Sequence, residues 1–268
     1  MTPQVFAILN VTPDSFSDGG QFADAAAAVA RGVQLKEQGA DIIDVGGEST
    51  RPGAERVDPA EEQERVIPVI RGLVAAGVPV SVDTMNASTA LAAAQAGASV
   101  INDVSGGLAD PEMYRAVAQS KLLYIAMHWR GHSDSMDDLA TYDDVVVDVR
   151  NELKARLAEM FVWGIAAEQV VLDPGLGFAK RAEHNWQLLG RLDDLATLGH
   201  PLLIGASRKR FLGDLLPEGA TTADRDLPTA IVTALAAQAG VWAVRVHDVR
   251  STRAALGVFE AWKNGRTA

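Results

Sequence analysis

Residues 41–61 read Asp-Ile-Ile-Asp-Val-Gly-Gly-Glu-Ser-Thr-Arg-Pro-Gly-Ala-Glu-Arg-Val-Asp-Pro-Ala-Glu, and this stretch contains one complete structural unit. Its apolar run over 41–45 predicts a buried strand, and the glycine-rich stretch 46–57 predicts a loop. Asp58, Pro59 and Glu61 then form a helix start, with Asp as the N-cap and Pro at the first helical position. The stretch therefore predicts a strand–loop–helix unit.

The same unit recurs along the whole chain of 268 residues. Short apolar runs predict strands over 5–9, 41–45, 79–82, 100–102, 122–127, 170–172, 202–204 and 243–246. Eight such units are typical of a closed (β/α)8 barrel, and almost wholly apolar strands fit burial on both faces of a parallel sheet. We therefore predict an α/β fold, a TIM barrel, as a single domain over residues 1–268. A doubly wound open sheet is the alternative.

The last helix is expected to begin at Asp248 and to direct Leu256, Phe259 and Trp262 towards the core. This expectation follows from their roughly helical spacing.

Composition excludes several classes of function. The chain has 24 Lys and Arg against 35 Asp and Glu, a net charge of −11, which argues against nucleic acid as a partner. It has no cysteine, so disulfides, thiolate zinc sites and cysteine nucleophiles are excluded. No apolar run approaches the ~18 residues of a membrane span, and no N-terminal stretch has the pattern of a signal peptide. We therefore expect no membrane association and a cytoplasmic location.

Polar or glycine-rich residues follow every predicted strand, at the end where TIM barrels carry their catalytic residues. They are Asn10, residues 46–53, Asp83, Asn102, Asp103, His128, Asp173, residues 207–210, Arg245 and His247. Taken singly, each has a structural interpretation: Asp103 and Asp248 can be helix N-caps, and Asp173 a turn residue. Together they predict one binding cavity, because polar groups at apolar strand ends need partners.

The residue types indicate two kinds of ligand. Asp83, Asn102, Asp173 and Lys209 combine hydrogen-bond acceptors and donors, which suits a flat heterocycle with an amino-pyrimidinone edge. A second set suits a diphosphate with Mg²⁺, because Arg binds phosphate oxygens through a planar fork and Asn can ligate a hard cation. That set is Asn10, Thr50, Arg51, Arg245 and His247.

Seven segments between residue 5 and about residue 250 resemble, in the family's order, the signatures of the dihydropteroate synthases. The two longest are Asn-Val-Thr-Pro-Asp-Ser-Phe-Ser-Asp-Gly-Gly at 10–20 and Asp-Val-Gly-Gly-Glu-Ser-Thr-Arg-Pro-Gly at 44–53. The shorter ones lie at 81–84, 101–107, 172–178, 205–209 and 245–249.

The resemblance implies a transferase of folate biosynthesis, of the family that sulfonamides target. The implied reaction joins 6-hydroxymethyl-7,8-dihydropterin diphosphate to p-aminobenzoate, giving 7,8-dihydropteroate and diphosphate. It also implies Mg²⁺ as cofactor and a homodimer. We expect an SN1-like path, because the site offers anions to the pterin and cations to the leaving group.

The resemblance also implies roles for individual residues. The pterin is expected between Asp83, Asn102, Met127, Asp173, Phe178 and Lys209. The diphosphate is expected at Asn10, Thr50, Arg51, Arg245 and His247, with Asn10 as the Mg²⁺ ligand. The p-aminobenzoate pocket is expected at Phe16, Pro52, Ser207 and Lys209. The catalytic residues are expected to be Asp83, Asp173, Lys209, Arg245 and His247.

One segment departs from the family. Many members carry Gly-x-Pro after Met127-His128, whereas this chain has Trp129-Arg130-Gly131-His132, so the role of this loop stays open. The spacing of His128 and His132 leaves a metal pair as a minor alternative.

Two other functions also stay open. One is a pterin-binding methyltransferase domain that uses methyltetrahydrofolate with a corrinoid partner, which would not need the loops at 10–16 and 49–52. The other is a non-catalytic pterin-binding paralogue, which should have lost residues of the anion site. This chain retains both loops and the anion-site residues Asn10, Arg51, Lys209, Arg245 and His247.

Overall fold

Eight parallel strands form one sheet whose order is β6-β5-β4-β3-β2-β1-β8-β7. The computed structural model describes residues 2–12, 20–48, 57–132, 136 and 138–265. The strands are β1 (Gln4–Asn10), β2 (Ile42–Gly46), β3 (Val80–Asp83), β4 (Val100–Asp103), β5 (Leu123–Met127), β6 (Val170–Asp173), β7 (Leu203–Ile204) and β8 (Ala243–Val246). An isolated bridge between Leu172 and Leu202 brings β6 beside the start of β7. The sheet is therefore a nearly closed barrel, and the TIM-barrel prediction is confirmed.

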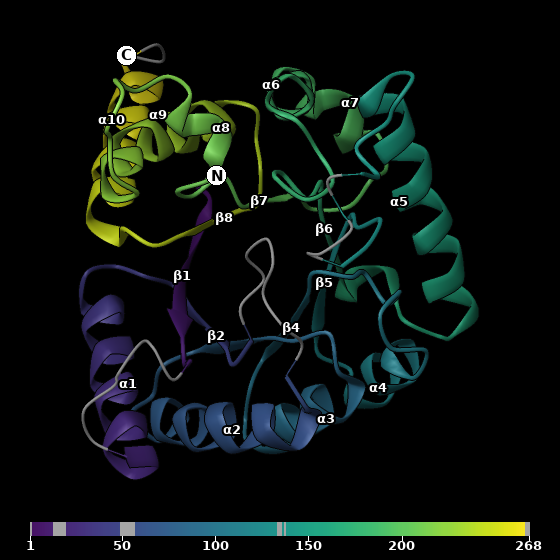
Figure 1. Cartoon of the computed structure of the whole chain (residues 1–268), viewed down its shortest axis with the longest axis vertical. Helices are drawn as coiled ribbons and strands as arrows, with labels where there is room; N and C mark the ends of the chain where they lie inside the picture. The colour runs from purple at the N-terminus through teal and green to yellow at the C-terminus, as the bar shows by residue number, and fades with distance from the viewer. Residues whose placement is uncertain (1, 13–19, 49–56, 133–135, 137, 266–268) are drawn as a thin grey trace.

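Helices surround the barrel on the outside (Figure 1). They are α1 (Gly20–Glu37), α2 (Pro59–Ala75), α3 (Ala87–Gln95), α4 (Met113–Ser120), α5 (Val145–Val162), α6 (Ala182–Gly190), α7 (Leu192–Ala196), α8 (Arg210–Gly213), α9 (Asp226–Gln238) and α10 (Val249–Asn264), with the 3-10 turns η2 (Ala167–Gln169) and η3 (Ala223–Arg225). Among these described residues, no helix has the length and apolar character needed to cross a membrane.

Local sequence explains where the helices begin. The Asp58 carboxylate accepts a hydrogen bond from the Ala60 amide at 2.8 Å, and Pro59 opens α2. Asp248 likewise accepts from the amides of Arg250 and Ser251 and begins α10. Both N-caps were predicted, since a short carboxylate satisfies amides that have no partner within the helix.

The end of α10 differs from the prediction. Leu256 is buried and Phe259 packs against the core, but Trp262 is 70% exposed. Two steps of three residues turn a helix about 120° away from its starting face, because each step falls about 60° short of a full turn. The prediction that Trp262 points inward was therefore wrong.

Alternation along the strands divides the barrel interior into an apolar end and a polar end. Inward side chains near the strand starts form one buried cluster: Phe6, Val100, Ile125, Val171, Leu203 and Ala243. Two residues further along most strands, the side chains on the same face are polar or small, because strand side chains alternate with a period of two. The register pairs Asp83 with Asn102 and Met127 with Asp173, which brings these side chains to one level of the barrel.

Candidate active site

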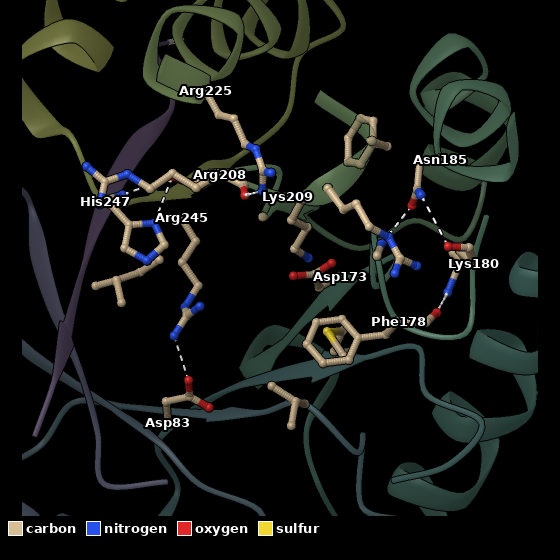
Figure 2. A pocket seen from close by; sticks show the side chains of 18 of the residues that line it. Asp83, Asp173, Phe178, Lys180, Asn185, Arg208, Lys209, Arg225, Arg245 and His247 are labelled. Atoms are coloured by element: carbon tan, nitrogen blue, oxygen red, sulfur yellow. Dashed lines mark hydrogen bonds and ion pairs between the residues drawn. The ribbon is translucent and has the colours of Figure 1, made fainter. Parts of the chain in front are cut away.

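A cavity of about 900 Å³ opens at the carboxyl ends of the strands. All ten of the predicted site residues that the structure describes line it: Asn10, Asp83, Asn102, Met127, Asp173, Phe178, Ser207, Lys209, Arg245 and His247. Figure 2 shows several of them converging from separate elements. The other four, Phe16, Thr50, Arg51 and Pro52, lie outside the described residues.

The floor of the cavity is a cluster of buried carboxylates around one guanidinium. Arg245 donates from Nε to Asp44 Oδ2 and from a terminal nitrogen to Asp83 Oδ2, each at 2.5 Å. Asn102 Nδ2 donates to the same Asp44 oxygen at 3.0 Å. We call Asp44, Asp83, Asn102 and Arg245 the acidic floor. Two carboxylates share one cation there, so the cluster has an excess of negative charge.

Burial shifts the proton affinities of the acidic floor. It raises the pKa of Asp83 to about 7, an effect that Arg245 opposes and the Asp44 carboxylate reinforces. Burial alone would lower the pKa of Arg245, but Asp44 and Asp83 outweigh it and raise that pKa above its ordinary value. The Oδ1 atom of Asp44 is buried and has no hydrogen-bond partner among the described residues. Of the acidic floor, Asp83, Asn102 and Arg245 line the cavity, so a ligand can meet their polar atoms there.

A second wall is built from the loops that follow β6 and β7. Asp173 Oδ1 accepts from the Gly175 amide at 2.7 Å, while Lys209 Nζ donates to the Leu176 carbonyl and lies 4.8 Å from the centre of the Phe178 ring. Burial lowers the pKa of Lys209 to about 8, although Asp173 opposes this, and burial raises the pKa of Asp173. Lys209 is thus a donor held beside a carboxylate and an aromatic face.

Glycine at position 205 leaves the space between the two charged groups of this wall open. A Cβ atom there would lie 3.6 Å from Asp173 Oδ2 and 4.0 Å from Lys209 Nζ. A flat ligand can therefore approach both side chains from the cavity.

Ser207 and His247 form the third part of the cavity. Ser207 Oγ accepts from the His247 amide at 3.1 Å and lies 2.9 Å from His247 Nδ1. Since the hydroxyl accepts from the amide, its own hydrogen can be donated to Nδ1, and a neutral ring then carries its proton on Nε2. That tautomer makes His247 a donor suited to an anion.

Asp103 has a different role from the one predicted. It does not cap a helix: its carboxylate accepts from the Ser105 amide and hydroxyl, the Gly107 amide and the Tyr124 hydroxyl, at 2.7–2.8 Å. It holds the turn after β4, where a short polar side chain satisfies nearby amides.

Two residues at the site were missed at the sequence level. Asp44 lies within a quoted signature, and its signal was a charge inside an otherwise apolar strand. Lys180 lines the cavity, whereas Asp44 lies beneath it; nothing in the spacing of Lys180 distinguishes it from a surface lysine.

The metal interpretation of His128 and His132 finds no support in the described part of the chain, which contains no group of three or more His, Cys, Asp or Glu residues able to hold a metal. The two ring nitrogens of His128 contact Glu152 and Lys180 instead, each at 2.8 Å.

Known proteins of similar sequence have this fold. Residues 6–247 match the family described as pterin binding enzyme. The chain is 49% identical over 264 residues to the dihydropteroate synthase of Mycobacterium leprae, which covers 97% of this chain and 93% of the relative. A Xanthomonas albilineans dihydropteroate synthase with 4-aminobenzoic acid superposes with a TM-score of 0.91 at 44% identity, over 98% of this chain and 93% of that one. The same enzyme in complex with 7,8-dihydropteroate gives 0.87 at 41% identity, over 98% and 94%.

Proposed function

The chain belongs to the dihydropteroate synthase family, and from this membership we propose how its cavity divides the reaction among its residues. The reaction is the condensation of 6-hydroxymethyl-7,8-dihydropterin diphosphate with p-aminobenzoate, which makes the protein a transferase of folate biosynthesis. The relatives give no support to the methyltransferase or the non-catalytic alternative. The single observation that carries our proposal is the cavity, which unites an acidic floor with Lys209, Arg245 and His247.

The pterin occupies the acidic floor and the Asp173 wall. Asp83 and Asp173 accept hydrogen bonds from the ring N–H and amino groups, Asn102 bonds the ring edge, and Lys209 donates to it. Met127 and Phe178 flank the ring faces, which is supported by their places in the lining of the cavity. Because the carboxylates are preorganised before the reaction, they can stabilise positive charge that spreads into the ring.

Binding of the pterin exchanges one partner of Arg245. In the structure its guanidinium donates a hydrogen bond to Asp83 Oδ2 at 2.5 Å. A pterin donor that takes this oxygen releases one arm of the guanidinium, which can then face the diphosphate together with His247. Thr50 and Arg51 complete the anion site in our proposal.

The Mg²⁺ ion is proposed to bind at Asn10. Mg²⁺ prefers oxygen ligands and usually takes only one or two from the protein, the others coming from phosphates and water. Asn10 fits this pattern, since it lines the cavity and a Cβ at Gly46 would lie 3.8 Å from its Oδ1. When bound, the ion supplies positive charge that stabilises the departing diphosphate.

The chemical step is proposed to be SN1-like. The bond between the exocyclic methylene carbon and the diphosphate oxygen breaks first, and its electron pair leaves with the diphosphate. The arylamine nitrogen of p-aminobenzoate, held near Phe16, Pro52, Ser207 and Lys209, then attacks the carbon and loses a proton. Sulfonamides resemble p-aminobenzoate, so we expect them to compete for the same pocket.

Diphosphate release tests the function and its path. Purified protein with pterin diphosphate and Mg²⁺ should form 7,8-dihydropteroate only when p-aminobenzoate is added, and a rapid burst of diphosphate without the amine supports the SN1-like order. A strict requirement for the amine before any bond breaks contradicts that order. Arg245→Ala should abolish release, since the leaving group loses its cation.

A homodimer through α9 and α10 is also proposed. These helices lie side by side (Figure 1), and both carry large apolar side chains that are 54–70% exposed: Leu227, Ile231, Leu235, Val258 and Trp262. Large exposed apolar patches mark interaction surfaces. Ile231→Glu should convert a dimer to a monomer, as measured by size-exclusion chromatography with light scattering, whereas Leu108→Glu, at an exposed position elsewhere, should not.

A cytoplasmic location stays a prediction that cell fractionation tests.

A further inference from the structure

A chain of hydrogen bonds, buried at His128 and Lys180, lies behind the Phe178 side of the cavity. His128 follows β5 and is 2% exposed; its Nε2 lies 2.8 Å from Glu152 Oε2 and its Nδ1 lies 2.8 Å from Lys180 Nζ. Lys180 is 4% exposed and donates to the Phe178 carbonyl at 2.9 Å, as Figure 2 shows. We call Arg130, Glu152, His128 and Lys180 the His128 chain.

The direction of the hydrogen bonds in the His128 chain follows from its chemistry. Burial, reinforced by Lys180, lowers the pKa of His128 to about 4, so the ring is neutral at pH 7 and carries one proton. A lysine amine donates in either protonation state, so Nδ1 accepts from Lys180. The ring proton therefore lies on Nε2 and is donated to Glu152.

The Arg130 end of the His128 chain also contacts the loop that contains Phe178. Arg130 donates to both oxygens of Glu152, at 3.2 and 2.5 Å, and lies 3.9 Å from the centre of the Tyr142 ring. The Tyr142 hydroxyl donates to the Ala179 carbonyl at 2.9 Å. Two routes thus hold the consecutive carbonyls of Phe178 and Ala179.

The loop needs this support because its backbone is strained. Ala179 has φ of +48°, a left-handed conformation that is unfavourable for a residue with a Cβ. Such conformations persist only where surrounding contacts hold them. The same loop presents the Phe178 ring and the Leu176 carbonyl, to which Lys209 donates.

We propose that Lys180 is a positioning residue for the pterin and acts through Phe178, with the rest of the His128 chain holding it in place. The proposal rests on the proposed function, which puts a face of the pterin ring against Phe178 and its edge near Lys209. Lys180 itself contributes no charge or proton to the reaction. Its loss is expected to weaken pterin binding, and to leave the amine pocket and the chemical step nearly unchanged.

Lys180→Met tests the proposal, because methionine keeps an unbranched chain in the buried space but cannot donate. We expect the KM for pterin diphosphate to rise about tenfold, with kcat and the KM for p-aminobenzoate within about twofold of the native values. A purely structural role predicts a lower Tm with an unchanged pterin KM, and that result would overturn the proposal. Lys154→Met, at an exposed lysine of α5, is the control.

A pair of variants at His128 separates the two contacts of the ring, and serves also if Lys180→Met does not fold. Asparagine can accept near the Nδ1 position and keeps a partner for Lys180, whereas glutamine reaches the Nε2 position and keeps a partner for Glu152. His128→Asn should therefore retain a lower pterin KM than His128→Gln. Equal values, or the reverse order, contradict the role of Lys180.

Asn102→Ala distinguishes failure of this proposal from failure of the site assignment beneath it. If Asn102→Ala leaves the pterin KM unchanged, the pterin does not bind at the acidic floor and the proposed function is wrong in that respect. If Asn102→Ala raises the pterin KM and Lys180→Met does not, the site assignment stands and the positioning role is wrong.

Discussion

The acidic floor and the His128 chain are both buried polar clusters at the ends of barrel strands, but only one of them is complete. In the His128 chain, both ring nitrogens of His128 and both oxygens of Glu152 have partners. In the acidic floor, Asp44 and Asp83 compete for Arg245, and Asp44 Oδ1 has no partner among the described residues.

The difference indicates what each cluster is for. A buried polar atom without a partner costs about 1–3 kcal/mol, so a fold that only needed stability would not keep one. Functional sites carry such costs, and three members of the acidic floor, Asp83, Asn102 and Arg245, line the cavity. We therefore read the incomplete cluster as the substrate site and the complete one as its support.

After Arg245→Ala, Asp83→Asn should have the largest effect. Synthase activity is expected to fall by about 10²–10³-fold, because the pterin loses an anionic acceptor. Stability should change in the opposite direction. The folded-state pKa of about 7 lies above the ordinary 3.8, so the fold favours the neutral form, and this contribution is lost as pH rises through 7.

At pH 8 the variant should therefore have a Tm equal to or above that of the native protein, measured by calorimetry. Asp193→Asn, at an exposed site on α7, should change neither property. A clear fall in Tm for Asp83→Asn would mean that the acidic floor is not a strained site.

Gly175 lies beside the His128 chain, and its replacement should be the next most damaging change. A Cβ there would lie 2.2 Å from the His128 carbonyl oxygen, and the residue has φ of +69°. We expect Gly175→Ala to lower the free energy of unfolding by about 3 kcal/mol, from backbone strain and overpacking together. Gly164→Ala isolates the strain, since φ is +82° but no atom lies within 4 Å, and should cost about 1 kcal/mol. Urea unfolding measures both, and equal losses would argue against the close approach to His128.

The complete cluster should also contribute to the pH dependence of stability, in the opposite direction to Asp83. The pKa of His128 is lowered from 6.5 to about 4, so the fold favours the neutral ring. That contribution is full above pH 6.5 and is lost as pH falls towards 4, with an upper bound of roughly 3 kcal/mol. His128→Gln should remove this loss of unfolding free energy between pH 7 and 4.5, and His200→Gln should leave the profile as it is. An identical slope in the native protein and His128→Gln would contradict the buried neutral ring.

Arg130→Gln should have the smallest effect, because Arg130 is the most exposed cation of the His128 chain. Its side chain is 21% exposed, and partly exposed ion pairs contribute about 1 kcal/mol at most. We expect a loss of that size and a pterin KM within about twofold of the native value. Arg156→Gln is matched in exposure, at 22%, and breaks a pair within one helix. A pterin KM raised as far as in Lys180→Met would show that the whole chain acts as one unit.

Sequence alone was sufficient to predict where the strands lie and which residues surround the mouth of the cavity. Each strand lies within one residue of its predicted range, because short apolar runs between glycine-rich loops allow few alternatives. The ten described site residues line one cavity because parallel strands deliver their carboxyl ends to the same side. Asn10, Asp173 and Arg245 could therefore be brought together without knowing a single distance.

The His128 chain could not be predicted in this way. Glu152 lies in the middle of α5, 24 residues from His128, and its position beside the ring depends on how α5 packs against the barrel. Lys180 is buried only because the loop after β6 turns back on itself through Ala179. Neither fact leaves a local pattern in the sequence, whereas Asp44 did, as a lone charge inside a strand.

The closure of the barrel between β6 and β7 has a consequence for its motions. β7 contains two residues and is joined to β6 by the single bridge from Leu172 to Leu202, while the other neighbouring strands share longer ladders. Local opening requires least free energy where fewest hydrogen bonds must break, so the amides of Leu203 and Ile204 should exchange with solvent deuterium sooner than those of β2 and β3. This seam separates the loop that carries Asp173 and Phe178 from the loop that carries Ser207 and Lys209. Local opening of the barrel is therefore expected first along this seam, between two loops that line the cavity.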